Sequence, residues 1–207
     1  MEITKFSEKD MNAAISMARQ TWHGYYDEFR AEYIRCIAEC IVRHNYTDED
    51  LAFKITCNGE VKGIIFGTRK GKMADLSVWV GEQCKTMNPQ EKELLERLND
   101  YMDEADRNTI AQMGDGDVKL SLFISIQKGC GRELLRAMMQ EFSAMGAKRM
   151  FLWTDTSCDH DYYPAHGFAL ASRYRDTHYS TEEADYMTYI YLSLIHISEP
   201  TRHAQIS

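Results

Sequence analysis

Two spacings of hydrophobic residues occur along this chain, and together they predict a domain of mixed helices and strands. Apolar residues three or four positions apart predict amphipathic helices at residues 11–25, 31–44, 89–105 and 131–145. Alternating or continuous apolar runs predict strands at residues 3–6, 51–57, 60–67, 118–125, 150–154, 168–174 and 184–191. A short helix is expected near residues 159–165. This order of elements is typical of an α/β domain.

Turn and cap residues define two of these boundaries. Asn58 and Gly59 separate two apolar runs and predict a tight hairpin, because both turn positions need a positive φ. Asn88, Pro89 and Glu91 have the order of an N-cap, a first-turn proline and an acidic third position, which predicts the start of a helix.

The region from residue 69 to 113 is the hardest to assign. Its first part, residues 69–87, is rich in turn residues and predicts a loop, in which residues 76–80 could form a short strand or edge segment. The helix that follows could end near Ala105 or continue towards Met113.

Composition narrows the class of protein. The 207 residues are 44% hydrophobic, enough for one sizeable core. Neither an apolar run of about 18 residues nor a signal-peptide pattern occurs, so we expect a cytoplasmic protein without a membrane partner. With 32 acidic and 24 basic residues, the net charge of −8 repels phosphate backbones. We therefore expect no nucleic-acid partner.

The six cysteines are scattered through the sequence. They form no Cys-x-x-Cys pair, and the cytoplasmic expectation favours reduced thiols. Histidines, cysteines and acidic residues have no metal-ligand spacing either, so we predict no metal.

A glycine-rich turn between strand 118–125 and helix 131–145 is the strongest candidate site. Backbone amides at a helix N-terminus can converge on a pyrophosphate, although a tight turn without a ligand could have the same sequence. A dinucleotide loop would need a small residue in place of Leu134, and a nucleoside-triphosphate loop would need Gly-Lys-Ser/Thr. The candidate residues are Gln127, Lys128, Gly129, Cys130, Gly131 and Arg132.

Cys130 has two interpretations. A helix N-terminus lowers the pKa of a thiol and raises its reactivity. The plainer interpretation, which we favour, is a small residue whose amide faces phosphate.

This turn resembles the acyl-CoA loop of the GCN5-related N-acetyltransferase (GNAT) superfamily, whose pattern is Arg or Gln, two residues, Gly, one residue, then Gly or Ala. Gly129 and Gly131 match, whereas Ile126 stands at the Arg or Gln position. Residues 58–67 are similar to the second and third strands of the family. Residues 162–168, Tyr-Tyr-Pro-Ala-His-Gly-Phe, are similar to its aromatic-Tyr-x-x-x-Gly-Phe signature.

The resemblance implies a GNAT fold over residues 1–191: a mixed, largely antiparallel central sheet flanked by helices, with a helical insertion at about 69–113. It also implies a bulged fourth strand and a fifth strand that diverges from it, with acetyl-CoA bound between them. Backbone groups of Ile124 and Ser125 would bind the pantetheine arm. Thr156 or Ser157 lies near a position where the family often has Asn.

The implied activity is transfer of an acetyl group from acetyl-CoA, as cosubstrate, to a primary amine by direct attack in a ternary complex. Tyr163 matches the tyrosine that returns a proton to the departing thiolate, and Asp155 is the nearest candidate general base. The alternative is a catalytically inactive acyl-CoA-binding sensor or interaction module.

The acceptor side is less specific in sequence. Trp22, Tyr25 and Tyr26 precede the second helix, in a region that commonly borders the acceptor site in this family, and aromatic faces suit an ammonium group. An ordinary helix end packed on the core would also fit. The expected partner is a small-molecule or peptide amine, and the protein is expected to be a monomer or homodimer.

The last residues, 192–207, are expected to be a non-native tail. Residues 192–202 resemble the translation of a transposase adapter used in sequencing libraries. We expect this tail, including Ile195 and Ile197, to be poorly packed.

Overall fold

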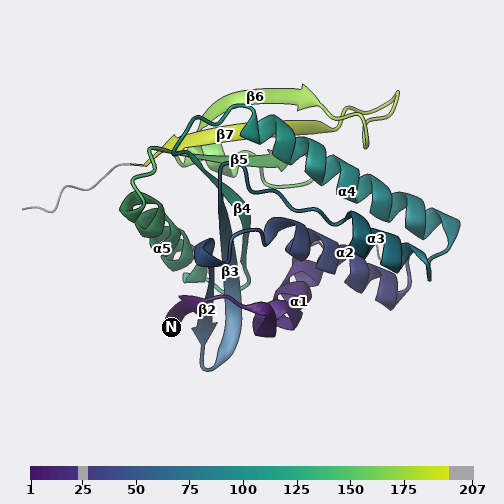
Figure 1. The fold of residues 1–207 in the computed structure, drawn as a ribbon, viewed down its shortest axis with the longest axis horizontal. Helices are drawn as coiled ribbons and strands as arrows, with labels where there is room; N and C mark the ends of the chain where they lie inside the picture. Colours follow the sequence, from purple (N-terminus) through teal and green to yellow (C-terminus); the bar gives the residue numbers. More distant parts are fainter. Residues whose placement is uncertain (23–27, 196–207) are drawn as a thin grey trace, which may run out of the picture.

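The computed structural model describes residues 1–22 and 28–195. Its centre is a seven-stranded sheet of order β1-β2-β3-β4-β5-β7-β6, with helices on both faces (Figure 1). The strands are β1 (Glu2–Lys5), β2 (Ala52–Cys57), β3 (Glu60–Arg69), β4 (Val118–Ser125), β5 (Arg149–Asp155), β6 (Ala169–Arg175) and β7 (Met187–Leu194). The helices are α1 (Met11–Thr21), α2 (Ala31–Asn45), α3 (Ser77–Cys84), α4 (Pro89–Ile110), α5 (Cys130–Ala144) and α6 (Tyr162–Ala165), with 3-10 turns at Glu8–Asp10 and Glu49–Leu51.

Neighbouring strands pair antiparallel except β4 and β5, which are parallel and joined through α5. The predicted mixed, largely antiparallel sheet is therefore confirmed. The β4–β5 pairing covers Val118 with Met150 and Lys119 with Phe151. Beyond these pairs the strands separate, and in Figure 1 strands β2 to β4 run down the view while β5 to β7 run across it.

Both cap and turn predictions are confirmed. Asn58 and Gly59 have φ values of 53° and 81°, as the hairpin requires. The Glu91 amide donates to Asn88 Oδ1 at 2.9 Å, and the Asn88 amide donates to Glu91 Oε2 at 3.1 Å. This capping box starts α4, which continues to Ile110 and so follows the longer of the two predicted courses.

The loop predicted at residues 69–87, with a possible short strand at 76–80, is wrong where α3 forms. This segment forms the start of α3 instead, and the amide of Ser77, the first residue of α3, donates to Asp75 Oδ1 at 3.0 Å. Val80 is buried against α2 and α4, whereas Val78 is 78% exposed. The apolar run therefore covers a helix face rather than extending the sheet.

A β-bulge in β4 changes which face its side chains cover. Phe66 of β3 pairs with Leu122 and Gly67 pairs with Leu120, so Ser121 is an extra residue in β4. A plain alternation would place Val118, Leu120, Leu122 and Ile124 on one face. Instead the first two pack with α5, and the last two pack with α1 and α2. The bulge in the fourth strand that the resemblance implied is present.

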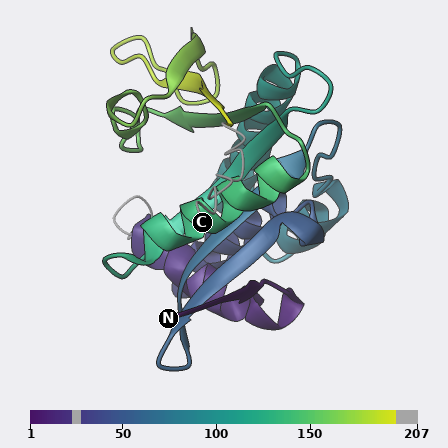
Figure 2. The same ribbon diagram turned by 90° about the vertical axis from the view of Figure 1, so that its left-hand side faces the viewer.

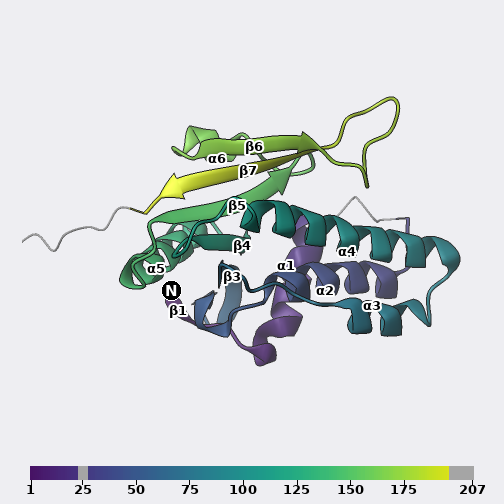
Figure 3. The same ribbon diagram turned by 45° about the horizontal axis from the view of Figure 1, so that its top comes forward.

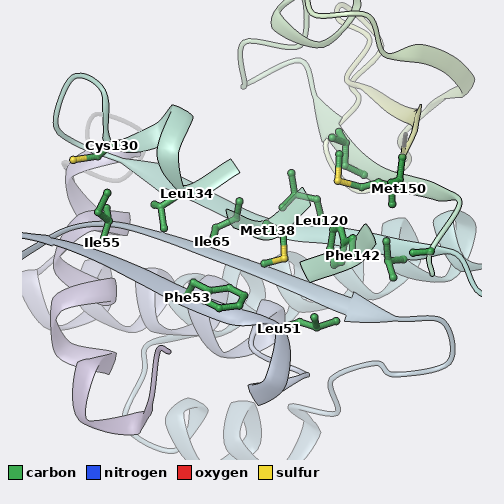
Figure 4. Close-up of a cluster of buried hydrophobic side chains, with 14 of the residues drawn as sticks. Leu51, Phe53, Ile55, Ile65, Leu120, Cys130, Leu134, Met138, Phe142 and Met150 are labelled. Atoms are coloured by element: carbon green, nitrogen blue, oxygen red, sulfur yellow. The ribbon is translucent and has the colours of Figure 1, made fainter. Parts of the chain in front are cut away.

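Two cores lie on opposite faces of the sheet. Leu134, Met138 and Phe142 of α5 pack on β2, β3 and β4 (Figure 4), and Figure 2 shows α5 crossing in front of the β2–β3 pair. On the other face α1 and α2 cover the sheet, and a third cluster joins α2, α3 and α4, which lie side by side in Figure 3. Within the described ranges, no helix is long and apolar enough to cross a bilayer.

The expectation of a poorly packed tail is wrong for residues 192–195. Leu192, Ser193 and Leu194 continue β7 and pair with the start of β5. Ile195 is 6% exposed in the core beneath α5, and its amide donates to the Lys148 carbonyl at 2.9 Å. Backbone pairing and burial both hold this part of the segment. Ile197 lies outside the described residues, and the origin of the tail stays a prediction.

Candidate functional site

The loop from β4 to α5 presents backbone amides at a helix N-terminus. Gly129, with φ of 90°, is the N-cap of α5. Within the described chain, the amides of residues 128, 129, 131 and 132 have no hydrogen-bond acceptor. Four amides without acceptors at the positive end of a helix dipole can bind an anion such as a pyrophosphate.

The two glycines of this loop have different physical roles. Gly129 has a left-handed backbone conformation that L side chains rarely adopt, and a Cβ there would meet no atom within 4 Å, so the space above it is open. A Cβ at Gly131 would lie 3.2 Å from Phe123 Cζ and 3.4 Å from Ser125 Cβ. Gly131 therefore allows α5 to begin directly against β4.

Other loop residues are held by the protein itself. The Ile126 amide donates to the Lys62 carbonyl at 3.0 Å, and the side chain is 38% exposed. The Gln127 carbonyl accepts from the Cys130 amide at 3.1 Å and from Ser125 Oγ at 3.2 Å. The Cys130 amide is thus already bound within the loop. Lys128 and Arg132 have exposed side chains.

The environment of Cys130 is opposite to the one that favours a reactive thiol. The residue is fully buried, and its Sγ lies 3.5 Å from Cys57 Sγ. Burial, followed by the contact with Cys57, raises the pKa of the Cys130 thiol. Loss of water outweighs the helix dipole here, so the reactive-thiol interpretation fails and the small-residue interpretation that we favoured holds for the side chain. The expectation that the Cys130 amide faces phosphate is wrong, because that amide donates to the Gln127 carbonyl.

Ile124 and Ser125 lie at the separated end of β4. Both pair with β3, opposite Ile64 and Gly63, but they come after Lys119, the last β4 residue paired with β5. Ile124 is buried and Ser125 is exposed. The edge of β4 that points toward β5 is therefore available next to the amide-rich loop.

Tyr163 is a half-buried residue of α6. Its ring stacks on Tyr191 at a centroid distance of 5.5 Å and meets Phe168 edge-on at 5.4 Å. Burial raises the pKa of the Tyr163 hydroxyl, and the neighbouring Cys158 adds to the effect. The phenol therefore keeps its proton at neutral pH.

Asp155 ends β5 and is 5% exposed. Its Oδ2 accepts from the Tyr101 hydroxyl at 2.8 Å. Its Oδ1 accepts from the Ser157 amide at 2.9 Å and from Ser157 Oγ at 2.6 Å, and Tyr186 in turn donates to Ser157 Oγ at 3.1 Å. The carboxylate thus fastens the end of β5 to α4 and to the following turn.

Sequence reasoning missed Tyr101 and Tyr186, and it named Ser157 only as an alternative to Thr156 and not as a partner of Asp155. Tyr101 was visible only as part of the apolar stripe of its helix, because periodicity assigns a face and says nothing about the partner of a hydroxyl. Ser157 follows Asp155 by two residues, and an aspartate two residues before a serine is a recognisable turn signal.

Thr156 uses its side chain to start β7. Thr156 Oγ1 donates to the Met187 carbonyl at 3.2 Å and accepts from the Met187 amide at 2.8 Å. Its hydroxyl is therefore engaged in holding β5 to β7.

Of the acceptor-side candidates, Trp22 lies next to the loop that follows β5. It is the C-cap of α1, packs on the core beneath α1 and α2, and lies close enough to Cys158 to partly offset the raised pKa of that thiol. Tyr25 and Tyr26 lie outside the described residues.

Two hollows of about 310 Å³ lie away from the glycine loop, one beside Glu28 and Glu91 and one beside Arg69 and Asp117.

Among residues 1–22 and 28–195, no three His, Cys, Asp or Glu side chains lie together in an arrangement that could hold a metal ion. The candidate site therefore consists of backbone amides, a strand edge and aromatic hydroxyls.

Known proteins resemble this chain in structure and not in sequence. No family model and no curated protein matches the sequence. The ribosomal-protein-S18-alanine N-acetyltransferase from Escherichia coli is 16% identical, with a TM-score of 0.52 over 97% of each chain. An acetyltransferase of the GNAT family from Streptococcus pneumoniae is 13% identical, with a TM-score of 0.50 over 94% of this chain and 99% of the other.

An agmatine N-acetyltransferase variant in its apo form is 8% identical, with a TM-score of 0.53 over 93% of this chain and 98% of the other. At these identities the likeness concerns the backbone alone. The chain has the fold of the GNAT acetyltransferases.

Proposed function

We propose that this protein transfers an acetyl group from acetyl-CoA to a primary amine. The observation that carries the proposal is the set of four amides without acceptors, at residues 128, 129, 131 and 132, beside the free edge of β4. The open space above Gly129 suits a phosphate group, because a Cβ there would meet no atom within 4 Å.

Different residues of this chain would bind acetyl-CoA and donate the proton that the reaction needs. Acetyl-CoA supplies an acetyl group activated as a thioester. The loop amides bind its pyrophosphate, and the backbone of Ile124 and Ser125 bonds to the pantetheine arm as an added strand would. Tyr163, kept protonated by its raised pKa, donates its proton to the sulfur of the leaving thiolate.

The proton of the attacking amine needs an acceptor. Asp155 was the sequence candidate, but both of its carboxylate oxygens already accept hydrogen bonds. We therefore assign Asp155 a positioning role and the proton transfer to water. Asp155→Asn keeps an acceptor at Oδ1, so we expect the pH dependence of kcat to keep its shape. Loss of the acidic limb of that profile, where kcat rises as a base is deprotonated, would restore Asp155 as the base.

The acceptor class stays open between a small amine and a peptide. Solved structures with this fold include one named for the alanine of a ribosomal protein and one named for agmatine. Trp22, beside the turn after β5, is the described residue that we propose to border the acceptor.

Calorimetry with acetyl-CoA tests this proposal first. Gly129→Asp places a carboxylate where the phosphate would lie, and Gly71→Asp is a matched control with φ of 88° and equally open surroundings. We expect wild type and Gly71→Asp to bind and Gly129→Asp to lose binding. A folded wild-type protein that does not bind acetyl-CoA would overturn the proposal.

The second candidate is an acyl-CoA-binding module without turnover. Two observations favour it: Ile126 stands where the family pattern has Arg or Gln, and the Asp155 carboxylate has no free oxygen. Release of free CoA thiol with any member of a broad amine panel would exclude it. Tight binding with no thiol release would support it.

A further inference from the structure

One carboxylate on α4 binds both of the strands that separate in this fold. Asp106 Oδ1 accepts a hydrogen bond from Trp153 Nε1 of β5 at 2.6 Å and pairs with Lys119 Nζ of β4. The Asp106 and Lys119 side chains are each 1% exposed. The Asp106 carboxylate is thus part of a fully buried ion pair and also accepts the indole N–H. A displacement of any of the three side chains would leave a buried charge without its partner, which is energetically costly.

This carboxylate lies where the two strands part. Lys119 is the last residue of β4 that pairs with β5, opposite Phe151. Trp153 is the second residue beyond that pair, on the same face of β5 as Phe151. Asp106 therefore contacts the last residue of β4 that pairs with β5 and, at the same time, a residue of β5 just beyond the paired segment.

A second hydrogen bond connects α4 with β5 further along the strand. Tyr101 lies five residues before Asp106 on α4, and its hydroxyl donates to Asp155 at 2.8 Å. The Tyr101 and Trp153 rings meet edge-on with centroids 5.5 Å apart. Residues 153 and 155 of β5 are thus both anchored to α4, which runs beside the strand in Figure 3.

We propose that Asp106 is a positioning residue that sets the separation between the ends of β4 and β5. Residues 120–125 and 152–155 carry backbone groups that parallel pairing could use, and such pairing would close the space between the strands. The bonds from Asp106 and Tyr101 hold β5 toward α4 instead. This inference rests on the proposed function for its ligand, because acetyl-CoA is what the separated strands would hold.

Three changes test it. Trp153→Phe removes the indole N–H and keeps an aromatic ring. Asp106→Leu combined with Lys119→Met removes the bridge without leaving a buried charge. The control, Asp117→Asn, weakens a different ion pair, at the paired end of the two strands. Asp117 (4% exposed) directly precedes β4 and accepts from the partly exposed Arg149 of β5 at 2.5 Å.

Dissociation constants for acetyl-CoA and melting temperatures are measured for each variant. We expect about a fivefold or greater rise in Kd for Trp153→Phe and for the double variant, because small displacements at a distance change ligand geometry. Asp117→Asn should melt lower and keep its Kd. Folded Trp153→Phe and double variants that bind within about twofold of wild type would overturn the inference.

Hydrogen exchange separates this inference from the proposed function. We expect faster exchange at residues 152–155 in the two bridge variants than in Asp117→Asn. If wild type does not bind acetyl-CoA, the proposed function falls and this measurement decides alone. Equal exchange at residues 152–155 in all variants would then overturn the role of Asp106.

Discussion

Tyr162 and Tyr163 are adjacent residues in different surroundings. Tyr162 is 36% exposed and stacks on His166, whereas Tyr163 packs between Phe168 and Tyr191. We propose Tyr163, whose hydroxyl pKa is raised by burial, as the proton donor in the reaction. We expect Tyr163→Phe to lower kcat by about 100-fold, which is typical for loss of a general acid.

Steady-state kinetics gives kcat, and calorimetry gives the Kd for acetyl-CoA, for variants of these two tyrosines. The Kd for acetyl-CoA should stay close to that of wild type in Tyr163→Phe, because the ring and its packing remain. Tyr162→Phe is the control and should keep kcat. Equal activity of both variants would remove Tyr163 from the chemistry and leave it as a packing residue.

Asp176 gives a prediction about stability and pH. The residue is fully buried; its Oδ1 accepts the amides of His178 and Tyr179, and its Oδ2 has no partner among the described residues. Burial raises its pKa above the ordinary 3.8. The folded chain therefore takes up this proton at higher pH than the unfolded chain, and stability falls as pH rises from 3.8 through the raised pKa.

We expect Asp176→Asn to be more stable than wild type at neutral pH, because an amide keeps the Oδ1 acceptor without a buried charge. The gain should appear as pH rises above the ordinary value and persist beyond the raised one. Denaturant unfolding at pH 4 and pH 7 measures it. Asp185→Asn, at a residue whose side chain is 65% exposed, is the control; an equal gain there would contradict this account.

At the residue scale, the sequence identified the loop positions that need glycine, but it left two interpretations of Cys130 open. A motif identifies which backbone positions need glycine, because that requirement is local. The pKa of a thiol depends on the atoms that bury it, and for Cys130 these include Cys57, which is distant in sequence. The same limit hid Tyr101, whose partner Asp155 lies 54 residues away.

At the element scale, α5 lies close to the sheet because β3 has glycines beneath it. A Cβ at Gly67 would lie 2.6 Å from Phe142 Cζ and 3.1 Å from Met138 Sδ. We expect Gly67→Ala to lower the free energy of unfolding by about 1–3 kcal/mol, since the helix must shift to admit the methyl group.

Gly81 provides the contrasting case within a helix. It lies inside α3, and a Cβ there would meet no atom within 4 Å. We expect Gly81→Ala to raise the free energy of unfolding by about 0.5–1 kcal/mol, because alanine loses less backbone entropy. Urea denaturation of both variants checks the pair, and a loss at Gly81 or a gain at Gly67 would contradict the packing described.

Element types were largely predictable, and the exceptions have structural causes. Periodicity and caps located α2, the β2–β3 hairpin, the start of α4 and the pair β4 and β5 with α5 between them. The segment 76–80 was ambiguous because a five-residue apolar run fits a strand or one face of a helix, and neighbouring helices decided the outcome. The family resemblance implied a bulge in β4, but the residues around Ser121 carry no local signal for its position, so the point at which the side chains change faces could not be predicted.

At the scale of the whole molecule, the C-terminal strand joins distant parts of the chain. Residues 192–194 pair with Arg149, Met150 and Phe151, and Ile195 fills the core beneath α5. We expect a chain ending at Tyr191 to melt below one ending at Ile195, because it loses both the pairing and the burial. Thermal unfolding of the two chains measures this difference, and equal melting temperatures would restore the earlier expectation for residues 192–195.

The parallel pairing of β4 with β5 has a consequence for folding cooperativity. Val118 and Lys119 carry the backbone bonds between the strands β1 to β4 and the strands β5 to β7. Each half has its own antiparallel ladders, so each can open with its own free energy. We expect native-state hydrogen exchange to sort slowly exchanging amides into two groups that follow this division. The molecule would then unfold through a partly open state in which one half of the sheet is still intact.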